Sequence, residues 1–107
     1  MKDQEKLQEL QFLEQNLNSI LMQKQALEME SAELQASLVE INKTKEDVFK
    51  LIGNLLIKAD PNSVKKELDE KIKHVGVRLK AYESQEKNIS KRIEEIRNEM
   101  IGNVKAA

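Results

Sequence analysis

Apolar residues recur at alternating steps of three and four through about the first 45 residues, a stretch without Gly or Pro. Such steps place one apolar stripe along a helix, and their persistence over several heptads is typical of a coiled coil. Lys24 and Ser31 are the polar interruptions of this first stripe. Its apolar members are Leu10, Leu13, Leu17, Ile20, Leu27, Leu34, Leu38 and Ile41.

A second stripe with the same spacing follows Asp60. Asp is a residue type that caps helix N-termini, and Pro61 suits the first helical position, where its missing amide hydrogen costs nothing. Glu86 interrupts this stripe, and Gly102-Asn103 offers a C-terminal stop. The stripe consists of Leu68, Ile72, Val75, Leu79, Tyr82, Ile89, Ile93, Ile96 and Met100.

The segment between the stripes, residues 47–59, is rich in residues that favour strands and is centred on Gly53-Asn54. A two-residue hairpin loop needs backbone angles that Gly and Asn tolerate, so we expect a β-hairpin with Ile52 opposite Leu55. Both of its faces are apolar, and a lone two-stranded hairpin cannot bury both, so we expect it to need another chain. One face carries Val48, Ile52, Leu55 and Ile57, and the other carries Phe49, Leu51 and Leu56.

Together these elements predict a mainly α fold, in which a long antiparallel two-helix coiled coil is connected by one short β-hairpin. The single domain spans 1–107, with the first helix over 1–46, the hairpin over 47–59 and the second helix over 60–104. Two Phe, one Tyr and no Trp are too few bulky aromatics for a compact core, which favours an extended or oligomeric shape.

Folding back at the Gly53-Asn54 turn places residues whose numbers sum to about 106 level with each other, and the two stripes then coincide. Lys24 and Glu86 lie about one turn apart in this register. One interpretation is that they pair and fix the register at some cost in stability. The other is that both side chains reach solvent along their aliphatic stems. The sequence leaves the two open.

Charge and candidate chemistry exclude several classes of function. The net charge is -1 with 35% charged residues, so we expect no basic face for nucleic acid. The single histidine, His74, lies on a charged stretch without cysteines, which argues against a metal site. Because the chain also lacks a phosphate-binding loop or a nucleophile paired with a base, we expect no catalytic residue, no cofactor and no enzyme activity.

The sequence shows no pattern of a signal peptide or of a membrane-spanning segment. The first residues lack the apolar core of a signal peptide, and no apolar run approaches the length of a membrane span. The sequence therefore predicts a soluble, cytoplasmic protein.

Apolar residues that the stripes do not need gather where the two helix ends meet, far from the hairpin. Leu7 and Phe12 lie off the stripe in the first helix, and Ile101 and Val104 lie off it in the second. With their neighbours on the stripes they would form an open apolar groove. The alternative is that scattered exposed apolar residues are normal and terminal turns are loose.

The hairpin segment from Val48 to Lys58, with Gln23-Lys24-Gln25 upstream and Arg78 and Gln85-Glu86 downstream, resembles the β-type subunit of prefoldin over nearly the whole chain. An α-type subunit would carry two hairpins, and this chain has room for one. The resemblance implies a complex of two α-type and four β-type subunits, whose hairpins form a β-barrel platform with the coiled coils hanging from it. Assembly residues would be Val48, Phe49, Leu51, Ile52, Leu55, Leu56 and Ile57.

The same resemblance implies a molecular chaperone that holds unfolded polypeptides at its coiled-coil tips without ATP and passes them to a cytosolic-type chaperonin. Client-binding residues would be Leu7, Leu10, Phe12, Leu13, Ile96, Met100, Ile101 and Val104. The competing interpretation is a structural coiled-coil adapter that binds one folded partner. An adapter explains the heptads but gives no reason for a hairpin that is apolar on both faces.

Overall fold

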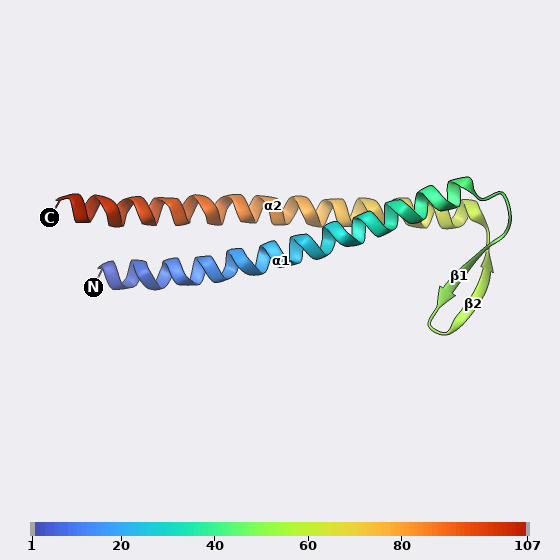
Figure 1. The fold of residues 1–107 in the computed structure, drawn as a ribbon, viewed down its shortest axis with the longest axis horizontal. Helices are drawn as coiled ribbons and strands as arrows, with labels where there is room; N and C mark the ends of the chain where they lie inside the picture. Colours follow the sequence, from blue (N-terminus) through green and yellow to red (C-terminus); the bar gives the residue numbers. More distant parts are fainter. Residues whose placement is uncertain (1, 107) are drawn as a thin grey trace. The chain divides into compact units, whose positions relative to one another are not determined.

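The computed structural model describes residues 2–106 and the side chains of residues 3–102. Its elements are α1 (Lys2–Lys43), β1 (Val48–Ile52), β2 (Leu55–Ala59) and α2 (Pro61–Ala106), as Figure 1 shows. Contacts divide the chain into two compact units. The first joins α1 up to Ala26 with α2 from Leu79 onward, and the second is the continuous stretch Leu27–Arg78.

In the first unit, α1 and α2 run antiparallel, and the predicted stripes face each other. Ile20, Ile93 and Ile96 are buried, and the remaining apolar stripe residues of this unit are half-buried. Ion pairs between the helices join residues whose numbers sum to within about five of 106, which confirms the predicted register in this unit. These pairs are Lys6–Glu99, Glu9–Arg92, Glu14–Arg97 and Lys24–Glu86.

The second unit holds the hairpin and the helix segments that lead into and out of it. Leu27, Ile41 and Val75 are buried here, and their neighbours on the stripes are half-buried. Asp60 begins α2 as predicted: its Oδ1 accepts a hydrogen bond from the amide of Asn62, and Pro61 is the first helical residue. The predicted mainly α fold is thereby confirmed.

Both predicted helix ends differ from the structure. α1 ends at Lys43, because Thr44 turns back: its amide donates to the carbonyl of Ile41 at 3.3 Å and its hydroxyl to that of Glu40 at 3.0 Å. α2 continues past the predicted stop at Gly102-Asn103 to Ala106. A glycine ends a helix when its backbone adopts a left-handed conformation. Gly102 does not do so, because among the described residues the positive φ belongs to Gly53, and the helix therefore continues.

The hairpin has the predicted register and the predicted two faces. Ile52 pairs with Leu55 and Val48 with Ala59, and Gly53 occupies the turn at a φ of 59°. Leu51 is 68% exposed on one face and Leu55 is 66% exposed on the other. Most of both faces is therefore uncovered within this chain, although Val48 at the base of the hairpin is half-buried.

The seam is the interface at which the apolar stripes of the two helices face each other. Truncating one of its side chains tests whether the seam stabilises the fold. Leu27→Ala removes a side chain that is only 4% exposed, so we expect a loss of about 2–5 kcal/mol in the free energy of unfolding. Met22→Ala, on the exposed surface of the same helix, should cost less than about 0.5 kcal/mol. Urea unfolding followed by circular dichroism measures both, and equal losses would contradict the assigned seam.

Candidate functional site

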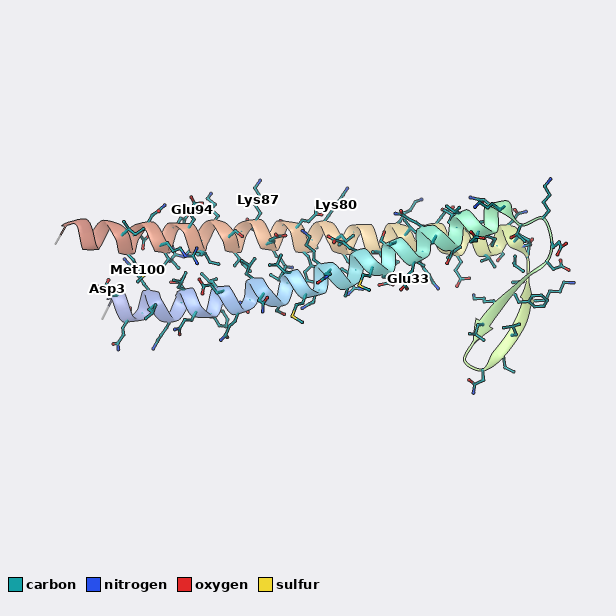
Figure 2. The ribbon with its side chains drawn as sticks, viewed as in Figure 1. Asp3, Glu33, Lys80, Lys87, Glu94 and Met100 are labelled. Atoms are coloured by element: carbon teal, nitrogen blue, oxygen red, sulfur yellow. The ribbon has the colours of Figure 1, made fainter. Side chains whose placement is uncertain are left out.

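The end of the coil where the helix termini meet carries the predicted apolar residues in three different environments. Leu7, Phe12 and Ile101 are exposed. Leu10, Leu13 and Met100 are half-buried, and Figure 2 shows Met100 between the two helices. Ile96 is 0% exposed, so its side chain packs the seam and is not accessible in this conformation. The side chain of Val104 lies outside the described residues.

One flank of the coil gathers part of this apolar surface. A shallow groove there is lined by residues of both helices, among them Glu14, Leu17, Ile93, Arg97 and Ile101. Leu7 precedes Glu14 by one heptad and so lies on the same flank of α1. The structure therefore brings Leu7 and Ile101 to one side of the coil.

Phe12 does not join this groove. At 3.6 residues per turn it points roughly 140° away from Leu7 around the axis of α1. Its 62% exposure agrees with a position on the outward face. The predicted single groove is thus divided into a flank site and a separate exposed aromatic residue.

Ion pairs fasten both flanks of this end. Glu14 pairs with Arg97 at 2.7 Å on the flank of the groove. On the opposite flank Arg92 reaches both carboxylate oxygens of Glu9, at 3.0 and 3.3 Å. The hydrogen bond to Glu9 is the main cause that raises the pKa of Arg92. Exposed pairs add little stability each, but they leave no unbalanced basic stripe on these flanks.

A polar layer interrupts the seam within the first unit. Lys24 Nζ lies 2.9 Å from Glu86 Oε2, with the two side chains 21% and 30% exposed. Next to them the hydroxyl of Tyr82 donates to Gln23 Oε1. The structure thus contains the ion pair that one of the two sequence interpretations requires. Its role in fixing the register stays a prediction.

A second ion pair, which the sequence did not reveal, connects β1 with α2 in the hairpin unit. Lys50 Nζ lies 2.6 Å from Glu67 Oε2. The pKa of Glu67 is lowered, mainly by the hydrogen bond from Lys50 and in part by Lys71, against the opposing effect of desolvation. The pair borders a groove of about 720 Å³ between the hairpin and the two helices, lined by Ile41, Val48, Val64, Leu68 and others.

The described residues were also compared with the requirements of a metal site and of a membrane span. Among residues 3–102, no cluster of three or more His, Asp or Glu side chains is arranged to hold a metal ion. His74 is exposed on α2. None of the described helices is long and apolar enough to cross a membrane.

Comparison with known proteins shows which family this chain resembles. Residues 4–107 match the family model described as "Prefoldin subunit". The chain belongs to the prefoldin family. It is 35% identical to the prefoldin subunit beta of Thermococcus onnurineus, over 84% of this chain and 79% of that protein. It is 33% identical to the prefoldin subunit beta of Saccharolobus islandicus, over 92% and 82% respectively.

A solved structure agrees with these relatives. The prefoldin beta subunit from Thermococcus strain KS-1 superposes with a TM-score of 0.91 at 31% identity, covering 95% of this chain and 91% of that one. The predicted resemblance to the β-type subunit is confirmed. Prefoldin is a family of chaperones rather than enzymes, and membership implies an oligomeric complex with other prefoldin subunits.

The Lys24–Glu86 pair can be tested with a double-mutant cycle. Lys24→Met and Glu86→Leu should each destabilise the coil, because each leaves one partly buried charge without its main partner, while the double variant should recover roughly 1 kcal/mol or more. Urea midpoints of the four proteins give the coupling energy. A coupling of zero would show that the two residues act independently.

The Lys50–Glu67 pair predicts a pH dependence. Because folding lowers the pKa of Glu67 below its usual 4.5, the stability it contributes is complete above that value and is lost as the pH falls through the lowered pKa. Glu67→Gln should therefore be less stable than the parent at about pH 7 and equally stable at about pH 2, where both side chains are neutral. An unchanged difference at both pH values would contradict this role.

Proposed function

We propose that this chain is a subunit of an ATP-independent chaperone that binds unfolded polypeptides at the end of its coiled coil and delivers them to a cytosolic-type chaperonin. The observation that carries the proposal is the exposure of Leu7, Phe12 and Ile101 at this end. The seam does not use these side chains, and unfolded chains present the apolar groups that would cover them. Membership of the prefoldin family supports the same conclusion.

The affinity of one coil end is expected to be low. Few apolar side chains are accessible there, and the half-buried Leu10, Leu13 and Met100 add only part of their surface. Several weak contacts from linked coils raise the overall affinity through effective concentration, while each contact remains reversible. Reversibility suits a chaperone that must release its client to a chaperonin.

The hairpin supplies the linkage. Strands from other subunits could cover its two exposed apolar faces, since a two-stranded sheet cannot bury both. We propose a cytoplasmic complex of two α-type and four β-type subunits, in which this hairpin contributes to a β-barrel platform. Val48, Phe49, Leu51, Ile52, Leu55, Leu56 and Ile57 would form its contacts in that platform.

Aggregation of a denatured model protein, without ATP, tests the client site. The protein assembled with an α-type partner should suppress aggregation, and Leu7→Ser with Ile101→Ser should remove most of the suppression, because the exposed apolar flank is lost. Met29→Ser with Val39→Ser is the matched control, since these residues are similarly exposed elsewhere on α1. Native mass measurement verifies that all three proteins still assemble.

The outcomes separate the alternatives. If the parent suppresses aggregation and both double variants do so equally well, the flank is not the client site. If the parent does not suppress aggregation but binds one folded protein saturably, the chain is an adapter rather than a chaperone subunit.

A further inference from the structure

The outward faces of the two helices in the first unit differ in their chemistry. On α1, the outward positions between Gln11 and Ala26 are all exposed, and none is charged. They are Gln11, Phe12, Gln15, Asn18, Ser19, Met22, Gln25 and Ala26. The charged residues within this stretch are Glu14 and Lys24, which pair across the coil with Arg97 and Glu86.

On α2, the outward face is densely charged. Figure 2 shows Lys80, Lys87 and Glu94 pointing away from the coil. Their neighbours Lys91 and Glu95 are also exposed. A charged outer face is the ordinary state of a coiled coil, because charges keep it soluble. The uncharged stretch of α1 is therefore the exception, in a chain of which 35% is charged.

The uncharged face offers two kinds of contact. The carboxamides of Gln11, Gln15, Asn18 and Gln25 each present donors and an acceptor without a net charge. An unfolded polypeptide exposes backbone amides and carbonyls that can exchange hydrogen bonds with water for bonds with such partners, whatever its side chains are. A face of this composition can bind backbone groups without selecting clients by the sign of their charge.

Phe12 and Met22 add apolar contacts to this face. They are 62% and 66% exposed, and their separation of ten positions corresponds to about 15 Å along the helix. An extended segment of about five residues spans that distance. Methionine is flexible and polarisable, and surfaces that accept varied partners use it for that reason.

We propose that the outward face of α1 from Gln11 to Ala26, which includes the exposed Phe12, is a second contact surface for unfolded polypeptide, separate from the groove that Ile101 lines at the coil end. The inference rests on the proposed chaperone function. A folded partner is a poorer occupant, because two large apolar side chains on one helix face are too few for the core of a stable interface. A client segment held by several weak contacts needs no such core.

Adding negative charge to this face tests the inference. The triple variant Gln15→Glu, Met22→Glu and Gln25→Glu, assembled with an α-type partner, should suppress aggregation of a denatured acidic protein about tenfold less effectively than the parent, because contacts repeated on several coils are weakened together. The matched control is Ala81→Glu, Ser84→Glu and Asn88→Glu, which adds the same charge at exposed outward positions of α2. The control should suppress aggregation as well as the parent.

Site-specific crosslinking provides a second measurement that is independent of charge. A photoreactive residue at position 22 should crosslink to the denatured protein, and the same residue at position 84 should not. Equal suppression by both triple variants, or equal crosslinking at the two positions, would overturn the inference while leaving the client site at the coil end intact. A parent that fails to suppress aggregation would overturn the proposed function, and the inference with it.

Discussion

A two-helix coil has only one interior, the seam between its helices, and this constraint governs the rest of the molecule. Each helix can bury one narrow stripe, so any apolar side chain off that stripe faces solvent within the chain. Single exposed apolar residues are ordinary, but groups of them on one surface mark places where partners bind. The exposed apolar residues of the hairpin, the coil end and the outward face of α1 are therefore the surfaces that we propose as contacts with other molecules.

Polar residues are the groups that we predict to fix the register of the two helices. Leucine and isoleucine fit many registers, and a uniform apolar stripe tolerates slippage. Lys24 opposite Glu86 supplies a layer that a shifted register would break, and the pairs Glu9–Arg92 and Glu14–Arg97 join corresponding flanks of the two helices. Asp60, Pro61 and the left-handed Gly53 mark the points where helix and turn must begin. Local and long-range preferences thus agree on one fold.

Most of the fold could be predicted from the sequence, because heptad spacing and a Gly-Asn turn are local signals. The same signals predicted the hairpin register and the exposure of Leu7 and Phe12. The end of α1 was less predictable, since Thr44 turns back through bonds to Glu40 and Ile41 that compete with further helix. Lys50 and Glu67 could not be paired from the sequence, because their contact depends on how the hairpin packs on the helices. The burial of Ile96 follows from its place on the stripe, which argues against its predicted role in client binding. The separation of Phe12 from Leu7 follows from helix geometry.

The most direct test of this account is whether the hairpin is needed for assembly with other prefoldin subunits. The variant Phe49→Ser, Leu51→Ser and Leu56→Ser changes one exposed face of the hairpin and leaves the seam untouched. Native mass spectrometry of parent and variant, each mixed with an α-type partner, should show a complex for the parent and separate chains for the variant, with the helical circular dichroism of the variant preserved. A variant that still forms the full complex would contradict the account, because the exposed hairpin face would then have no part in assembly.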